Sequence, residues 1–123
     1  MFEDLKNAGK HLICDFKDIK NLILLNNLTK LKQLFKNICQ EHNFIILGEL
    51  EHSFEPQGIS IVFLLSESHI SLHTFPEKQF MSFDLYSCRQ YENNDDYIKI
   101  FKSVVDELNA SERSSLQIIE RFF

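Results

Sequence analysis

Two neighbouring segments near the middle of the chain, residues 66–77 and 78–88, alternate between apolar and polar side chains. Successive side chains of a β-strand point to opposite faces, so this alternation predicts two strands of a sheet with one apolar face and one polar face. The apolar positions are Ile70, Leu72, Met81, Phe83 and Leu85, and the polar positions are His69, Ser71, His73, Ser82, Asp84, Tyr86 and Cys88. We therefore expect an antiparallel sheet that packs against helices through one face only.

The polar face of this predicted sheet has an unusual composition. It carries histidine, serine, tyrosine and cysteine, where a solvated sheet face normally carries long charged side chains such as lysine and glutamate. This composition indicates a face that is partly covered. A second copy of the chain is the covering partner that we expect.

The remaining periodicity predicts four more strands and two helices. Apolar residues recur at the helical spacing of three and four over residues 28–42 and 97–108, and the polar run 93–96 precedes the second helix. Short apolar or alternating segments predict strands over residues 10–16, 43–54, 59–65 and 115–123. The predicted order is β-α-β-β followed by β-β-α-β. This order favours a two-layer α+β sandwich, in which an antiparallel sheet carries both helices on one face.

The length of 123 residues is that of one domain, and we treat residues 1–123 as a single domain. The 13 basic and 18 acidic residues give a formal net charge of −5 without a basic cluster, so a nucleic-acid partner is not expected. No apolar run approaches membrane-spanning length. The N-terminal segment lacks the charged and apolar regions of a signal peptide, so we expect a soluble cytoplasmic protein without a membrane partner.

Three cysteines, Cys14, Cys39 and Cys88, lie far apart in the sequence. Their odd number and wide spacing do not fit a disulfide framework or a paired-cysteine zinc site. Buried, reduced thiols are the ordinary interpretation of Cys14 and Cys39. Before any family resemblance is considered, the same interpretation applies to Cys88.

Two familiar kinds of site can be assembled from the polar residues of the sheet, and both fit poorly. A serine hydrolase triad of Ser68, His73 and Asp84 lacks the Gly-x-Ser-x-Gly turn of many such enzymes. A metal site of His69, His73 and Cys88 requires two histidines that lie roughly 13 Å apart on a strand, at about 3.3 Å per residue. Metal ligands lie only about 2 Å from the ion, so no metal cofactor is expected. A half-buried polar face without chemistry is the remaining alternative.

The segment SESHISLHTFPE (66–77), together with FDLYSC (83–88), resembles the bacterial and archaeal S-adenosylmethionine decarboxylase proenzymes. The family's pattern is Glu-Ser-His, then His-Thr-aromatic-Pro-Glu, then a strand that ends in cysteine. The matching residues are Glu67, Ser68, His69, His73, Thr74, Phe75, Pro76, Glu77 and Cys88. The segments GKHLICDF and PQGIS extend the resemblance over most of the chain. It implies a small, self-cleaving, pyruvoyl-dependent enzyme of polyamine (spermidine) biosynthesis.

The resemblance implies that the chain cleaves itself between Glu67 and Ser68. The Ser68 hydroxyl would attack the Glu67 carbonyl and form an ester. Loss of the Ser68 α-proton would then expel this ester, and the residue left behind would become a pyruvoyl group. The two products would be a β chain of residues 1–67 and an α chain of residues 68–123, which stay packed as one fold.

The resemblance also assigns five further residues. His73 matches the family's processing proton acceptor, and Ser60 matches a serine that supports processing. An imidazole suits the first role because it can take up and release a proton. In catalysis the pyruvoyl group would form a Schiff base with the substrate. Cys88 matches the family's proton donor, a role that a protonated thiol can fill. Phe54 and Glu77 match substrate contacts to adenine and to the ribose hydroxyls.

The resemblance further implies a homodimer of cleaved protomers, an αββα arrangement in which the polar sheet faces meet near the active sites. Phe75 stands where many members have tryptophan, and Arg89 stands where glycine is usual. Arg89 would reshape the pocket or pair with a different substrate carboxylate. Phe54 and Glu77 favour S-adenosylmethionine as the small-molecule substrate. Two alternatives stay open: a pyruvoyl-dependent ornithine or arginine decarboxylase of the same family, and an uncleaved, inactive regulatory paralogue.

Overall fold

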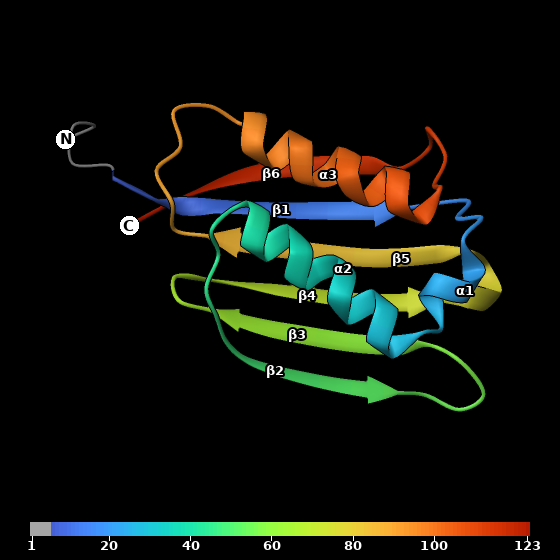
Figure 1. Ribbon diagram of the computed structural model, residues 1–123. Helices are drawn as coiled ribbons and strands as arrows, with labels where there is room; N and C mark the ends of the chain where they lie inside the picture. Colours follow the sequence, from blue (N-terminus) through green and yellow to red (C-terminus); the bar gives the residue numbers. More distant parts are fainter. Residues whose placement is uncertain (1–5) are drawn as a thin grey trace.

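The two alternating segments form adjacent strands at the centre of a six-stranded antiparallel sheet (Figure 1). The computed structural model describes residues 6–123, so the segment examined for a signal peptide lies partly outside the described residues. The spatial order of the strands is β2-β3-β4-β5-β1-β6. The strands are β1 (Asn7–Phe16), β2 (Ile46–Ser53), β3 (Ile59–Leu65), β4 (Ser68–Phe75), β5 (Phe80–Ser87) and β6 (Ser115–Phe122). This architecture confirms the predicted α+β fold.

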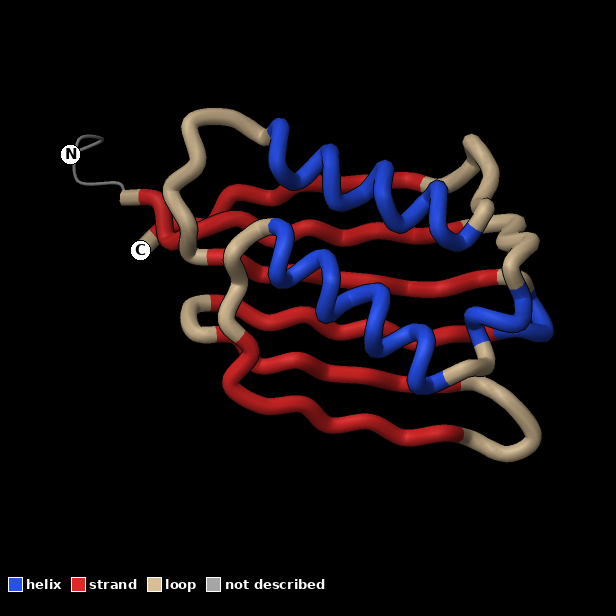
Figure 2. The backbone as a smooth tube through the Cα atoms, viewed as in Figure 1, coloured by secondary structure: helices blue, strands red, loops and turns tan. Residues whose placement is uncertain are grey.

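Two long helices, α2 (Leu28–Glu41) and α3 (Asp95–Leu108), lie on the same face of this sheet, as Figures 1 and 2 show. A short helix α1 (Leu22–Leu25) and a single turn η2 (Pro76–Lys78) lie in the connections. The buried helical residues follow the predicted spacing, and they are Leu31, Phe35, Ile38 and Cys39 in α2 and Tyr97, Ile100, Val104 and Leu108 in α3. No helix within residues 6–123 has the length and apolar character that a membrane crossing requires.

Two predicted strands differ from the observed strands by three residues at their N-terminal ends. The strand predicted from residue 43 begins at Ile46, because Asn43 adopts a left-handed conformation (φ 60°) directly after the C-cap of α2. The strand predicted from residue 10 begins at Asn7, because an irregularity next to Gly9 lets β1 continue its pairing with β6. Phe54 lies just beyond the end of β2, in the loop to β3. None of these differences changes the order of the elements.

The predicted faces of β4 and β5 are confirmed by burial. Ile70, Leu72, Met81, Phe83 and Leu85 are at most 3% exposed beneath the helices, whereas the polar positions between them are half-buried or exposed. Burial of one such side chain contributes about 1.5–3 kcal/mol. A shift in register by one residue would turn all five toward solvent, so the hydrophobic pattern fixes which side chains occupy the uncovered face.

The register of the sheet separates the two ends of β4. Ser68 pairs with Ser87 of β5 at one end, and His73 pairs with Ser82 of β5 and Ser60 of β3 near the other. His73 lies five positions after Ser68 along β4, which corresponds to roughly 16 Å at about 3.3 Å per residue. The predicted site residues are therefore distributed over both ends of the strand.

Candidate active site

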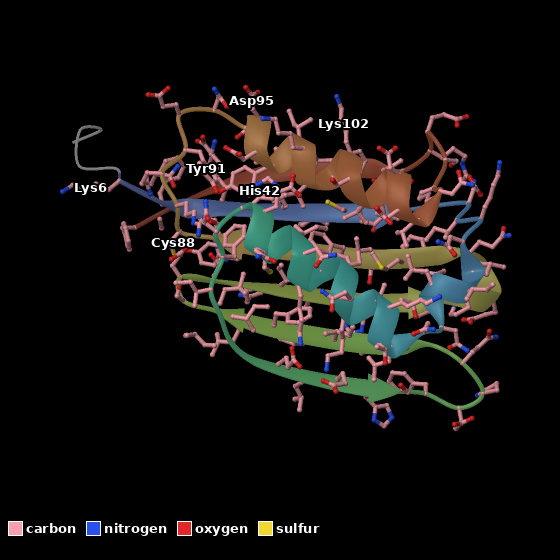
Figure 3. All side chains as sticks on the ribbon, viewed as in Figure 1. Lys6, His42, Cys88, Tyr91, Asp95 and Lys102 are labelled. Carbon is pink, nitrogen blue, oxygen red and sulfur yellow. The ribbon has the colours of Figure 1, made fainter. Side chains whose placement is uncertain are left out.

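The predicted site residues form two groups. We name the group where the β3–β4 turn meets the end of β5 the hairpin cluster. It contains the predicted residues Glu67, Ser68 and Cys88, together with Arg89, which was noted only as a departure from the family pattern. We name the group at the opposite end of β4 the His73 pocket, and its members are Phe54, Ser60, His73 and Glu77. In Figure 3, Cys88 lies at the same end of the sheet as His42 and Tyr91, two further residues close to the hairpin cluster.

Ser68 is the first residue of β4 and lies on the side of the sheet that faces the helices. Its side chain is buried, with 7% of the residue exposed, and its hydroxyl oxygen has no hydrogen-bond partner among residues 6–123. A buried hydroxyl without a partner typically costs about 1–3 kcal/mol. No hydrogen bond within residues 6–123 therefore competes for the Ser68 hydroxyl. Ser68 directly follows Glu67, and cleavage is predicted between these two residues.

The carbonyl oxygen of Glu67 is held by the backbone of the neighbouring strand end. The backbone N–H of Cys88 donates a hydrogen bond to this oxygen at 3.3 Å. An N–H group directed at a carbonyl oxygen stabilises the negative charge that develops there when a nucleophile attacks the carbon. The hairpin cluster therefore combines a free hydroxyl with a polarised carbonyl one residue earlier.

Gly9 of β1 lies against the same strand end. Its φ is 120°, and a Cβ at this position would lie 2.3 Å from the Ser87 carbonyl oxygen and 3.0 Å from the Cys88 Cα. Cβ atoms do not approach backbone atoms this closely, so only glycine fits. This requirement gives a physical reason for the glycine of the GKHLICDF segment.

The three thiols have different surroundings. Cys14 and Cys39 are buried as predicted, and burial raises their pKa values to about 12 and about 11. Cys88 is exposed, and its thiol donates to the hydroxyl oxygen of Tyr86 at 3.7 Å. Tyr86 in turn donates to the carbonyl oxygen of Ala8. Cys88 is therefore the accessible thiol, and its proton has a defined acceptor on the uncovered side of the sheet.

Arg89 makes several contacts within the chain. Its Nε donates to Glu67 Oε1 at 2.6 Å and its Nη1 to the Tyr91 hydroxyl at 3.0 Å. Its two terminal nitrogens also donate to the carbonyl oxygens of His42 and Asn43. The hydrogen bond from Arg89 lowers the pKa of the Glu67 carboxyl. The carboxylate partner of Arg89 in this structure is thus Glu67, next to the predicted cleavage point.

The His73 pocket brings together four residues that the sequence analysis assigned to processing and substrate binding. The Ser60 hydroxyl and His73 Nδ1 are hydrogen-bonded at 2.6 Å. Phe54 and Glu77 line the same cavity of about 310 Å³, together with Phe75 at the position where many relatives have tryptophan. An aromatic ring, an imidazole and a carboxylate thus share one cavity.

The structure also brings together a group that the sequence analysis missed. His11 Nε2 donates to Asp84 Oδ2 at 2.7 Å, and His69 Nε2 lies 3.9 Å from the same oxygen. The Ser71 hydroxyl donates to the other carboxylate oxygen. Burial alone would raise the pKa of Asp84, but the hydrogen bonds from Ser71 and His11 outweigh burial and lower it.

The ligand atoms of His11, His69 and Asp84 lie within 4.8 Å of one another. Two imidazoles and a carboxylate form a donor set that a divalent transition metal accepts, although here Asp84 is already hydrogen-bonded. The set differs from the rejected combination of His69, His73 and Cys88. The sequence alone does not place His11 in this group, because β1 is far from β4 and β5 in the sequence. Only the pairing of β1 with β5 brings His11 close to Asp84.

The open face, which we define as the side of the sheet away from the helices, also carries exposed apolar residues. Their exposed fractions run from 38% to 76%, and they are Ile13, Leu50, Val62, Leu64 and Ile119. The cross-strand pairs place them on either side of the polar centre formed by β4 and β5. Exposed apolar surface of this kind indicates a contact surface for another molecule.

These observations define a class of protein: an α+β sandwich with one uncovered sheet face and, at the start of a central strand, a buried serine whose hydroxyl has no hydrogen-bond partner among residues 6–123. The sequence profile of the family described as S-adenosylmethionine decarboxylase matches residues 10–121. The chain therefore belongs to the S-adenosylmethionine decarboxylase family. This finding confirms the resemblance that was identified from residues 66–77 and 83–88.

Curated relatives from several organisms are similar to much of this chain. The S-adenosylmethionine decarboxylase proenzyme of Bacillus velezensis is 31% identical over 121 residues, which cover 93% of this chain and 86% of the relative. The proenzyme of Methanococcus aeolicus is 32% identical, over 76% of this chain and 80% of the relative. The proenzyme of Thermosipho africanus is 37% identical over 68% of this chain, which spans 64% of that relative's length.

Two solved structures share the fold. The adenosylmethionine decarboxylase of Aquifex aeolicus superposes with a TM-score of 0.81 at 24% identity, over 96% of this chain and 93% of that protein. A Trypanosoma brucei AdoMetDC superposes with a TM-score of 0.61 at 13% identity, over 92% of this chain and 46% of that protein. At these identities the two structures support the α+β fold and not the details of the site.

Proposed function

We propose that this chain is a proenzyme that cleaves itself before Ser68 and then decarboxylates S-adenosylmethionine. The observation that carries the proposal is the hairpin cluster: a buried, unpaired Ser68 hydroxyl next to a Glu67 carbonyl that accepts a hydrogen bond from Cys88. Three relatives are named S-adenosylmethionine decarboxylase proenzymes, which supports the same function for this chain. The product would supply aminopropyl groups for polyamine biosynthesis.

The cleavage step follows from the chemistry of these residues. Ser68 Oγ forms a bond to the carbonyl carbon of Glu67 while the Cys88 N–H stabilises the charge on the carbonyl oxygen. The carbon–nitrogen bond then breaks, and the hydroxyl proton ends on the freed Ser68 amine. The peptide bond has become an ester. Removal of the Ser68 α-proton expels the Glu67 carboxylate, and hydrolysis with loss of ammonia leaves a pyruvoyl group at residue 68.

His73 is the proposed base for the α-proton, and its distance from Ser68 supports a site shared with a second copy of the chain. Within one chain, His73 lies roughly 16 Å along β4 from Ser68, too far for direct proton transfer. A homodimer with facing open faces would bring the His73 pocket of one copy to the hairpin cluster of the other. The exposed apolar residues of the open face give such a contact a hydrophobic driving force.

The two products of cleavage would remain interlocked. Residues 1–67 contain β1, β2 and β3, and residues 68–123 contain β4, β5 and β6. In the sheet, β1 lies between β5 and β6, so the first chain is inserted into the second. Separation would break main-chain pairing on both sides of β1.

For the decarboxylation itself, the pyruvoyl group would supply an electron-accepting carbonyl that stabilises the charge left when carbon dioxide departs. Cys88 would deliver a proton to the substrate carbon, since its thiol is exposed and its proton is held by Tyr86. In the His73 pocket, Phe54 would stack on adenine and Glu77 would accept hydrogen bonds from the ribose hydroxyls. The cavity of about 310 Å³ is at the small end of ligand sites.

Intact mass followed over time tests the proposal at its first step. We expect two fragments, residues 1–67 and residues 68–123, the second with the mass of an N-terminal pyruvoyl group. Carbon dioxide release from carboxyl-labelled S-adenosylmethionine, compared with labelled ornithine and arginine, then tests the substrate. A chain that stays whole would support the inactive paralogue, and turnover of ornithine or arginine alone would refute S-adenosylmethionine as the substrate.

A further inference from the structure

Neither the proposed cleavage nor the proposed decarboxylation uses Arg89, although its side chain binds the carboxylate of Glu67 next to the predicted cleavage point. The family resemblance has glycine at this position, and glycine can make none of these contacts. All three guanidinium nitrogens donate hydrogen bonds, to Glu67, to Tyr91 and to the carbonyl oxygens of His42 and Asn43. A planar guanidinium bound on several sides has little freedom to turn.

The far side of the guanidinium is anchored on the connection between α2 and β2. His42 is the C-cap of α2, and the carbonyl end of a helix attracts positive charge. The guanidinium carbon also lies 4.1 Å from the ring centroid of Phe44, which is buried. Only 22% of the Arg89 side chain is exposed. Arg89 is therefore a fixed link between the end of α2 and Glu67.

Two consecutive residues thus hold Glu67 at two different points. Cys88 N–H binds the carbonyl oxygen of Glu67, and Arg89 Nε binds its carboxylate. Together these contacts restrict rotation of the segment that carries the carbonyl. Attack by a neighbouring hydroxyl depends steeply on such orientation, because displacement of reacting atoms by about 1 Å can cost on the order of a hundredfold in rate.

We propose that Arg89 is a positioning residue for self-cleavage, which holds Glu67 so that its carbonyl stays on the Cys88 N–H and faces the Ser68 hydroxyl. This inference rests on the proposed function. It also gives Arg89 a role after cleavage. Arg89 belongs to residues 68–123, whereas two of its partners, Glu67 and Phe44, belong to residues 1–67, so the same contacts would tie the new C-terminus of one chain to the other.

The test is the rate constant of cleavage in freshly refolded precursor, measured by intact mass. We expect Arg89→Met to slow cleavage on the order of tenfold, and Glu67→Met to do the same. The double variant should be no slower than either single variant, because each already breaks the same pair. Arg89→Lys keeps the charge without the forked geometry and should cleave at an intermediate rate. The matched control is Arg113→Met, which removes an exposed ion pair with Asp18 and should leave the rate unchanged.

Melting temperature and circular dichroism, recorded on the same variants, separate positioning from folding. A merely structural Arg89 would lower the melting temperature of Arg89→Met and leave the cleavage rate constant of the folded fraction at the wild-type value, which would overturn the inference. Additive effects of Arg89→Met and Glu67→Met would also overturn it. A wild-type chain that never cleaves would instead refute the proposed function, and the inference with it.

Discussion

At the scale of single residues, the proposed function gives the backbone and the side chain of Cys88 different roles. The N–H of Cys88 binds the Glu67 carbonyl, whereas the thiol of Cys88 lies on the open face next to Tyr86. Self-cleavage would use the backbone group, and decarboxylation would use the thiol. Because the two groups belong to one residue, the two proposed reactions would share a location without sharing a functional group.

Ser68→Ala tests the residue on which the proposed function depends. Alanine removes the nucleophile, so we expect no cleavage and a single mass after prolonged incubation. The removed hydroxyl has no hydrogen-bond partner within the described part of the chain, so the free energy of unfolding should stay within about 1 kcal/mol of wild type or rise. Urea unfolding measures this change. Two fragments from Ser68→Ala would contradict the assignment of the nucleophile.

Thr74→Val is the matched control on the same strand and the same face. The buried Thr74 hydroxyl accepts from the Ile59 N–H and donates to the Leu25 carbonyl, both at 2.9 Å. Its removal leaves these groups unpaired, so we expect a loss of about 1–3 kcal/mol in stability. Cleavage of the folded protein should continue. The pair of variants therefore separates a paired structural hydroxyl from an unpaired reactive one.

At the scale of elements, the local sequence pattern predicts the position of a strand in the sheet only when its pairing partner is the next strand in the sequence. The alternation in β4 and β5 gave the correct faces, and the two strands are consecutive in both sequence and sheet. β1 was also predicted as a strand, but its place between β5 and β6 was not, because a pairing between distant strands leaves no local periodicity. His11 was therefore missed as the neighbour of His69 and Asp84, and the contacts of Arg89 with the end of α2 were missed for the same reason.

Gly9→Ala tests the close approach of β1 to β5. The new Cβ would collide with the Ser87 carbonyl oxygen, and the positive φ of Gly9 disfavours any side chain, so we expect a stability loss on the order of 1–3 kcal/mol. Cleavage should slow as well, because the displaced backbone includes the Cys88 N–H. Gly48→Ala is the control, since among residues 6–123 no atom beyond its own chain neighbours would lie within 4 Å of the new Cβ. Equal effects of the two variants in urea unfolding would argue against the steric requirement.

The group of His11, Ser71 and Asp84 predicts a pH dependence of stability. The folded-state pKa of Asp84 is lowered, so its hydrogen bonds stabilise the fold at pH values above the ordinary aspartate pKa of about 3.9. This contribution is lost as the pH falls through the lower, folded-state value. We expect the free energy of unfolding of wild type to fall more steeply below about pH 4 than that of Asp84→Asn. Asp106→Asn, at an exposed position of α3, is the control and should keep the wild-type slope. Identical slopes for Asp84→Asn and wild type would refute the role of Asp84.

At the scale of the whole molecule, the two groups of site residues present a geometric problem that one chain does not solve. The hairpin cluster and the His73 pocket lie at opposite ends of β4, and the sheet that joins them is rigidly paired on both sides. The proposed two-fold arrangement of facing sheets would resolve this problem, because it would reverse the direction of β4 in the second copy. One dimer would then contain two complete sites, each built from both chains.

Mixing two inactive variants tests this arrangement. Ser68→Ala lacks the nucleophile and His73→Ala lacks the base, so each homodimer alone should fail to mature, the first remaining uncleaved and the second stalling before the pyruvoyl group forms. A mixed dimer would place the intact His73 of the Ser68→Ala copy next to the intact Ser68 of the His73→Ala copy, which gives one complete site. We therefore expect the His73→Ala chain, marked by a mass tag and unfolded and refolded together with its partner, to yield a pyruvoyl-bearing fragment only in the mixture. Maturation of His73→Ala by itself would remove His73 as the base, and a mixture that never matures would leave the two groups without the shared site on which the dimer argument rests.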